Sequence, residues 1–408
     1  MTIQEYEDKI LNYIDSKRED IISYFQKMVQ CKSYTTQEKE IGELLRKEMK
    51  EWGLSDVTSI EKEPGHPNIV GTITGREEGP TLYFNGHLDV LPEGRREAWE
   101  VEPFSGEIKD DCLWGRGSVD MKGGTFGSFL AGAVLETLQV PIRGKVVFTG
   151  VCDEQICGER GIRYLIDCGA IKKEREDDMG INCEPTNLTH VVIANKGVLR
   201  ADVNFIGKTA HGARPWLGVN AIEHANIFMT RILELNKTLA RENHPLLNPP
   251  HILLAMIEGG QATNVVPDHC KVTITKRMLP GDSYEQSVKD YQDIIDKMKE
   301  EDPTVNGVLH IWEEYRPPVE ISKDTPVIGY VNDAYEKVCG RPVQFRGGEG
   351  GTDASHVVHR TGIPMIVFGP GDVSMCGAPN EHVPLQDLID AVKVYALTIL
   401  YSMGVAEE

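Results

Sequence analysis

The feature that most constrains the fold is a set of polar motifs that directly follow strand-like apolar runs. Residues 81–84 read Thr-Leu-Tyr-Phe and lead into His87 and Asp89, and a glycine-flanked segment carries Asp120 further along. Side chains two residues apart on a strand point the same way, so we expect His87 and Asp89 to share a face. A neutral imidazole is a good ligand for a divalent metal, and a carboxylate beside it can fix its tautomer. The two motifs together predict a metal site.

Two acidic clusters follow strand-like runs further along the chain. Asp153 and Glu154 come just after the run 144–151, and Glu184 follows the run 179–182. Each cluster alone fits a solvated loop or an ordinary strand end. However, acidic groups at the end of a buried strand need a metal or a hydrogen-bonding partner. Active sites of layered α/β sheets lie at the carboxyl ends of strands, where these residues fall.

Helices and strands alternate in a pattern typical of an α/β fold. Near residue 197 the pattern changes to a compact α+β unit, and after Pro317 and Pro318 the alternation resumes. At 408 residues the chain is too long for one ordinary core. We therefore predict a discontinuous metal-binding domain (1–196 and 314–408), built on a sheet layered by helices, with an inserted domain at 197–313. The expected helices are 4–30, 37–52, 123–138, 220–240, 283–301 and 386–403, and the expected strands are 68–74, 80–85, 144–151, 179–182, 198–206, 251–257, 270–276, 308–313 and 364–368.

Composition and charge narrow the class of function. With 40% apolar and 26% charged residues the chain has the composition of a globular protein, and no apolar run is long enough for a membrane span. The net charge of −20 argues against nucleic-acid or anionic-membrane partners. An acidic N-terminus without signal-peptide features, and nine scattered cysteines without Cys-x-x-Cys spacing, predict a cytoplasmic protein.

With four clusters in order, the chain resembles the co-catalytic zinc hydrolases that include acetylornithine deacetylase, succinyl-diaminopimelate desuccinylase, aminoacylase and the glutamate carboxypeptidases. The resemblance covers nearly the whole chain. Besides the four clusters, it includes the motifs at 99–106, 207–212, 215–221, 259–267, 277–281, 350–354 and 368–371.

The resemblance implies a zinc-peptidase-like catalytic domain with a mixed sheet and assigns roles by position. His87 and Glu184 would bind one metal, Asp120 would bridge two metals, and Asp89 would orient His87. Glu154 would be the general base that takes a proton from a metal-activated water and passes it to the leaving amine.

The resemblance also implies that the inserted domain is a lid and a dimerisation module, and the chain a homodimer. His211 would reach an active site, commonly the partner subunit's, and stabilise the oxyanion. Asn264 and Arg277 would hold a substrate carboxylate, for which arginine is well suited. Gly351 and Thr352 would contact the substrate through backbone and hydroxyl.

The chain departs from the family pattern at two positions, and in the family both positions bind the same metal. Gln155 stands where the family has an acidic ligand of the second metal, and the family's C-terminal histidine falls on Gly377 or, with a gap, on Cys376. A neutral amide is a poor substitute for a carboxylate on a divalent cation. Three explanations are open: one tight metal, an unusual second site using Gln155, Cys376 or His382, or loss of hydrolysis in favour of ligand binding or another reaction.

The sequence therefore predicts a metal-dependent hydrolase of amide bonds that acts on a small N-acyl amino acid or dipeptide-like carboxylate. The expected cofactor is one tight zinc ion, with cobalt or manganese as alternatives, bound by His87, Asp120 and Glu184. The competing interpretation is a non-hydrolytic, ligand-binding homologue. The sequence does not separate a deacylase from a dipeptidase.

Overall fold

The computed structural model describes residues 1–407, which divide into two compact units. Unit 1 comprises Met1–Ile193, Ile321–Arg346 and the chain from Thr352 onward. Unit 2 comprises Ala194–Glu320 and Gly347–Gly351, so it contains the whole of the expected insertion 197–313. No helix of the described residues is long and apolar enough to cross a membrane.

Unit 1 is built around a mixed β-sheet, as the fold prediction required. Three neighbouring strands, β6 (Arg143–Val151), β3 (Glu77–His87) and β7 (Met179–Asn182), run parallel, so their carboxyl ends meet at one edge. Their apolar side chains fill the interior, with the rings of Phe84 and Phe148 stacked 5.4 Å apart. The sheet order is β1-β2-β6-β3-β7-β15-β8-β13, and β14 also pairs with β8. The further strands are β1 (Asp56–Glu61), β2 (Pro67–Thr74), β8 (His190–Asn195), β13 (Val319–Glu320), β14 (Gln344–Gly348) and β15 (Met365–Val367).

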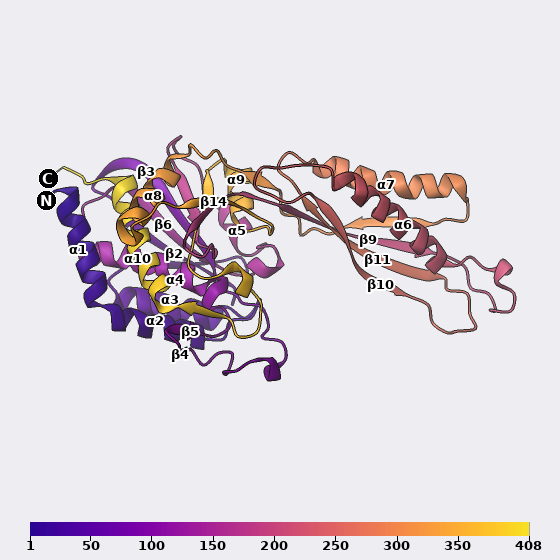
Figure 1. Cartoon of the computed structure of the whole chain (residues 1–408), viewed down its shortest axis with the longest axis horizontal. Helices are drawn as coiled ribbons and strands as arrows, with labels where there is room; N and C mark the ends of the chain where they lie inside the picture. The colour runs from indigo at the N-terminus through magenta and orange to yellow at the C-terminus, as the bar shows by residue number, and fades with distance from the viewer. Residues whose placement is uncertain (408) are drawn as a thin grey trace. The chain divides into compact units, whose positions relative to one another are not determined.

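Helices cover this sheet, and a small sheet of order β16-β5-β4 lies beside them (Figure 1). The central helix α4 (Gly123–Thr137) is buried from Gly123 to Leu135, which explains its many small and apolar residues. A Cβ on Gly124 would lie 1.8 Å from the carbonyl oxygen of Cys183, so glycine is required there for the close approach. The other elements are α1 (Ile3–Ser16), α2 (Arg18–Gln30), α3 (Lys39–Glu51), α5 (Ile162–Asp167), α8 (Pro326–Cys339), α9 (Ala354–Thr361), α10 (Leu385–Met403), β4 (Glu107–Lys109), β5 (Cys112–Trp114) and β16 (His382–Pro384).

Unit 1 contains several elements that were not predicted, among them β8 and α5, and two further differences have a clear physical reason. The helix expected over 4–30 is two helices, because α1 ends at a C-cap on Lys17 before α2 begins. Strand β1 was not expected, because its sequence Asp-Val-Thr-Ser-Ile-Glu is largely polar. It forms as the edge strand of the sheet, where half-exposed polar residues are tolerated.

Unit 2 is a four-stranded antiparallel sheet with helices on one face, and Figure 1 shows α6 and α7 lying along the strands. Leu199, Ala201 and Val203 of β9 point into the helix-covered core. Their neighbours Arg200 and Asp202 therefore lie on the opposite face. Both helices begin at capping side chains, Asn220 and Ser283. The elements are β9 (Gly197–Ile206), α6 (Ala221–Leu239), β10 (His251–Gly259), β11 (His269–Met278), α7 (Tyr284–Glu301) and β12 (Gly307–Ile311), in the sheet order β10-β11-β9-β12.

Candidate metal and catalytic site

Four predicted side chains converge at the carboxyl edge of the parallel strands. His87 is the last residue of β3, while Glu154 and Glu184 follow the ends of β6 and β7. The Nε2 atom of His87 lies 3.0 Å from Oδ1 of Asp120, 3.6 Å from Oε1 of Glu184 and 4.0 Å from Oε2 of Glu154. Ligand atoms of His87, Glu154 and Glu184 all lie within 4.8 Å of one another. One imidazole nitrogen therefore faces three carboxylates.

The electrostatics of this cluster favour a bound cation. Burial raises the pKa of Glu184 well above its ordinary value, and the charges of Asp120 and Glu154 raise it further. Burial lowers the pKa of His87, but its bond to Asp120 and the charges of Glu184 and Glu154 outweigh burial and raise the pKa well above its ordinary value. Carboxylates crowded in this way are stabilised by positive charge, and one nitrogen with several carboxylate oxygens is a donor set that suits zinc. The residues present therefore fit a divalent metal.

The backbone around Asp120 is fixed by a buried ion pair. Oε1 of Glu381 accepts the N–H groups of Val119 and Asp120, at 2.9 and 3.0 Å. Its Oε2 pairs with Nη1 of Arg116 at 2.5 Å, and both side chains are buried. Gly117 adopts φ +86°, which allows the tight turn before Asp120. Neither Arg116 nor Glu381 was predicted as a site residue, although both lie in or beside the sequence motifs of the site.

Asp89 serves the site in two ways. Its main-chain oxygen lies 2.7 Å from Nδ1 of His87, while its carboxylate Oδ1 is 3.7 Å from that nitrogen. The main chain of Asp89 therefore orients the imidazole, with Nε2 directed at the cluster. The carboxylate instead accepts the N–H groups of Glu154 (3.1 Å) and Gln155 (3.2 Å) and the hydroxyl of Thr35 (2.9 Å).

Glu38, on the other side of this loop, was missed by the sequence analysis. Its side chain is completely buried, and Oε1 accepts the N–H of Asp153 at 3.1 Å. Asp153 itself has φ +48°, and its carboxylate accepts N–H groups of Arg160 and Gly161, each at 3.0 Å. The carboxylate of Asp153 is thus occupied by hydrogen bonds within the loop. Glu154 is the acid of this pair that faces the cluster. Glu38 lies in a polar stretch with no motif, so no local signal indicated it.

The residues that depart from the family pattern also lie near Asp120. Burial raises the pKa of the Asp120 carboxyl, but His87 and, to a smaller extent, the nearby side chain of Gln155 outweigh burial and lower the pKa below its ordinary value. Burial, followed by the charges of Asp120 and Glu184, raises the pKa of the Cys376 thiol. His382, by contrast, stacks on Trp114 with ring centroids 4.4 Å apart, and its Nδ1 lies 2.7 Å from the carbonyl oxygen of Asn380. Gln155 and Cys376 are therefore better placed than His382 to act at the cluster.

The remaining predicted residues are distributed over both units. In unit 2, His211 and Asn264 are exposed and lie in paired loops, because Gly212 N–H donates to the Asn264 carbonyl at 2.7 Å. Arg277 lies near the end of β11. The carbonyl oxygen of Gly351 accepts from Arg316 at 2.7 Å, whereas Thr352 belongs to unit 1.

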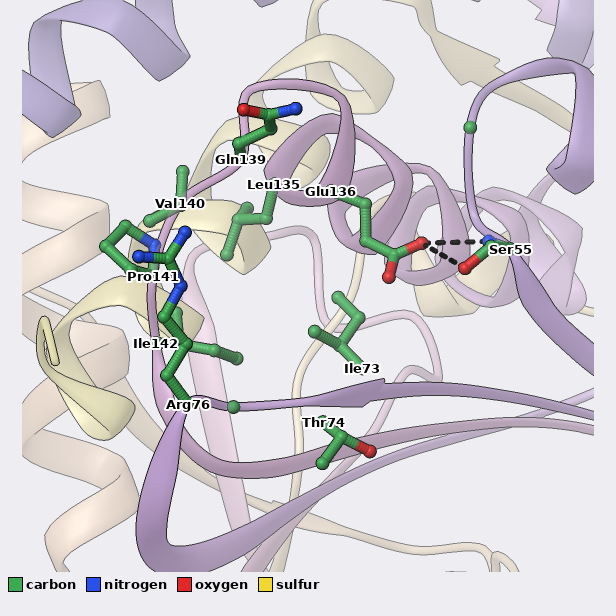
Figure 2. A pocket seen from close by; sticks show the side chains of 12 residues that line it. Ser55, Ile73, Thr74, Arg76, Leu135, Glu136, Gln139, Val140, Pro141 and Ile142 are labelled. Atoms are coloured by element: carbon green, nitrogen blue, oxygen red, sulfur yellow. Dashed lines mark hydrogen bonds between the residues drawn. The ribbon is translucent and has the colours of Figure 1, made fainter.

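A pocket of about 330 Å³ lies elsewhere in unit 1, and Figure 2 shows its lining. Its walls are mixed, with apolar Ile73 and Leu135 and polar Arg76, Glu136 and Gln139 among the lining residues. The carboxylate of Glu136 at its rim is bound by the N–H and hydroxyl of Ser55 (Figure 2). Because its lining includes none of the clustered residues, we place the chemistry at His87 and not in this pocket.

Comparisons with known proteins show what the chain is similar to. Residues 83–401 match the model of Peptidase family M20/M25/M40. The chain is 30% identical over 341 residues to acetylornithine deacetylase from Myxococcus xanthus, which covers 83% of this chain and 84% of that protein. The di-peptidase Dug1p from Saccharomyces cerevisiae superposes with a TM-score of 0.78 at 14% identity, covering 100% of both chains. The YXEP protein of Bacillus subtilis, a dinuclear metal binding peptidase, gives a TM-score of 0.70 at 14% identity over 96% of this chain and 100% of that chain.

Proposed function

The chain belongs to Peptidase family M20/M25/M40 and is a metal-dependent hydrolase of amide bonds, and we propose that it cleaves a small N-acyl amino acid or a dipeptide-like carboxylate. The observation that carries this proposal is the meeting of His87, Asp120, Glu154 and Glu184 at one edge of the sheet. The similarity to acetylornithine deacetylase favours a deacylase. The similarity of fold to a di-peptidase makes a dipeptide the alternative substrate.

His87, Asp120 and Glu184 would hold one tight divalent metal, with zinc favoured by the donor set and cobalt or manganese as alternatives. Such an ion lowers the pKa of water and polarises the scissile carbonyl. A single metal is supported by Gln155, whose side chain lies near Asp120 where relatives would place a second carboxylate ligand. A neutral amide adds no negative charge to hold a second cation.

Glu154 would act as the general base. It is buried, it faces the cluster, and its backbone N–H is held by the carboxylate of Asp89. In this role Glu154 takes a proton from the attacking water and returns it to the leaving amine. Asp89 and Glu38 hold the loop in place from its two sides and do not themselves move the proton.

Unit 2 would bind the substrate carboxylate through Asn264 and Arg277, with Gly351 and Thr352 as further contacts and His211 stabilising the oxyanion. We also propose a cytoplasmic homodimer formed through unit 2. Strand β10 is an edge of its sheet, and Leu253, Met256 and Ile257 on it are each more than half exposed. An exposed apolar edge strand favours pairing with a second copy.

The experiment that tests this proposal measures metal content per chain together with hydrolysis of a panel of N-acyl amino acids and dipeptides. One metal per chain together with turnover supports the single-metal hydrolase. The control is Glu154→Gln, which keeps the fold and removes the general base. Two metals of equal occupancy would contradict the single-metal site and direct attention to Cys376. A protein with no tight metal and no turnover would instead be the ligand-binding homologue.

A further inference from the structure

The pocket of Figure 2 combines apolar walls with two opposite charges. Ile73 and Leu135 line it and are otherwise buried, while Arg76 and Glu136 are its charged lining residues. Figure 2 shows Arg76 and Glu136 on opposite sides of the pocket, with Ile73 and Leu135 between them. Sites for small molecules are typically hollows of roughly 300–1,000 Å³ in which a few polar groups orient the ligand. At about 330 Å³ this pocket has the size and the lining of such a site.

The pocket lies at the other end of the parallel strands from the metal cluster. Its residue Ile142 directly precedes β6, whereas Glu154 follows the opposite end of that strand. The nine residues of β6 rise about 3.3 Å each, so roughly 30 Å of strand separates the two places. A ligand in the pocket would therefore not touch the residues assigned to hydrolysis.

Arg76 has a fixed backbone and an open side chain. Its N–H donates to the carbonyl of Ile142 at 2.9 Å, and the N–H of the preceding Gly75 donates to the carbonyl of Gly144 at 2.8 Å. These bonds hold the turn between β2 and β3. Within the described part of the chain, the exposed guanidinium makes no hydrogen bond or ion pair. A guanidinium presented in this way suits a carboxylate, which it can bind through two parallel hydrogen bonds.

Glu136 is held at one oxygen and open at the other. The N–H and the hydroxyl of Ser55 both donate to its Oε2, at 2.8 and 3.3 Å. No hydrogen bond from the described residues reaches Oε1, so this oxygen is available to a donor on a ligand. Glu136 also lies in the last turn of α4, where the helix dipole favours a positive charge. This side of the pocket therefore suits an ammonium group.

We propose that the pocket binds a linear ω-amino acid, with its carboxylate on Arg76 and its ammonium on Glu136. Ile73 and Leu135 would contact the methylene chain between the two charges. An α-amino acid fits less well, because it carries both charges on one carbon while Arg76 and Glu136 lie on opposite sides of the pocket. The site uses none of the metal ligands, so this inference does not rest on the proposed function.

The test compares 6-aminohexanoate with three matched compounds. Norleucine is its isomer with both charges on one carbon, and hexanoate and hexylamine each lack one of the charges. Titration calorimetry should give a Kd for 6-aminohexanoate at least about 10-fold lower than for any of the three, as expected when one charge-assisted contact is lost. Norleucine binding as tightly as 6-aminohexanoate, or no detectable binding of 6-aminohexanoate, would overturn the proposal.

Variants test whether the ligand lies in this pocket. Arg76→Gln and Glu136→Gln should each raise the Kd for 6-aminohexanoate by at least about 10-fold, whereas Arg76→Lys, which keeps the charge, should retain most of the affinity. Arg277→Gln, in unit 2, is the control for binding at the proposed substrate site and should leave the Kd unchanged. Weaker binding in Arg277→Gln with unchanged binding in Arg76→Gln would place the ligand at the substrate site and overturn the proposal.

Reversing one charge gives a test that a folding defect cannot imitate. Arg76→Glu places acids on both sides of the pocket, and Arg76 is exposed, so the change should be tolerated. The variant should bind 1,6-diaminohexane at least about 10-fold more tightly than 6-aminohexanoate, and the wild-type protein should show the opposite order. The same order in both proteins would contradict the site. Because calorimetry measures binding without hydrolysis, absence of turnover would overturn the proposed function and leave this result standing.

Discussion

At the scale of single residues, the loop that carries Glu154 is held by two buried carboxylates that approach it from different parts of the chain. Asp89 accepts the N–H groups of Glu154 and Gln155, and Glu38 accepts that of Asp153. Asp89 could be found from its motif, although its carboxylate serves the loop while its main chain serves His87. Glu38 could not be found, because its role depends on a contact across 115 residues of chain.

Replacing Glu154 should separate metal binding from turnover. Glu154→Gln keeps the shape of the side chain but removes the proton acceptor. We expect metal content and KM to stay close to wild type while kcat falls by at least ~10²-fold, the lower end for general acid–base catalysis. Steady-state kinetics with metal analysis provide the measurement. Near-normal turnover would assign proton transfer to another group.

Glu38 should act on kcat through the loop and not through the substrate. Glu38→Gln weakens the hold on Asp153 and the 3.3 Å contact with Nδ1 of His66. We expect kcat to fall by roughly 10-fold with little change in KM, as for other residues that support a catalytic ligand. Glu43→Gln, at an exposed site on α3, is the matched control. Equal changes in kcat and KM, or a lowered Tm with unchanged kcat, would make Glu38 a residue of general stability.

At the scale of elements, most of the site could be predicted from the residues that follow the ends of strands. Apolar runs identified β2, β6 and β7 closely, and the polar residues after β6 and β7 are the ones that meet His87. The strand order β6-β3-β7, which brings these ends together, could not be predicted from the apolar runs. The order follows from pairing between strands far apart in the chain, and contacts such as that of Gly124 with Cys183 are likewise not local in sequence.

Helix α10 contains a testable source of pH-dependent stability. Burial, followed by the charge of Asp390, raises the pKa of Asp387 to about 6, from an ordinary value of 3.8. The folded state therefore binds this proton more tightly than the unfolded state. Its contribution favours folding at low pH and is lost as pH rises from about 4 to about 6.

Asp387→Asn should remove this dependence. At pH 7 we expect the variant to be more stable than wild type by about 1 kcal/mol, since solvent screening and the positive end of the helix dipole reduce the effect. At pH 4 the two proteins should unfold at similar temperatures. Thermal unfolding across pH 4–8 measures the difference, with Glu300→Gln on the exposed face of α7 as control. A wild type that is more stable than the variant at pH 7 would contradict the assignment.

At the scale of the whole molecule, the alternating pattern predicted an α/β fold with an α+β insertion, and the mixed sheet with its helices confirms that class. Other features come from distant contacts. The segment 347–351 groups with unit 2 through bonds such as that between Lys196 and Glu349, which no local pattern records. Arg277 could be singled out from its motif, whereas its position opposite Val198 of β9 follows only from strand register.

The proposed dimer gives His211 a role that can be tested by mixing two inactive variants. His211 is exposed and belongs to unit 2, whereas the clustered metal ligands belong to unit 1. We expect His211→Ala to keep the metal and to lower kcat by ~10²–10³-fold, as loss of one oxyanion donor typically does. If His211 serves the partner's site, a mixed dimer of His211→Ala and Glu154→Gln chains contains one site with both residues intact. Activity should therefore return in part after subunit exchange, and should not return when either variant is incubated alone. Proven exchange without any recovery would place His211 at the site of its own chain, and an active monomer would remove the dimer from the mechanism.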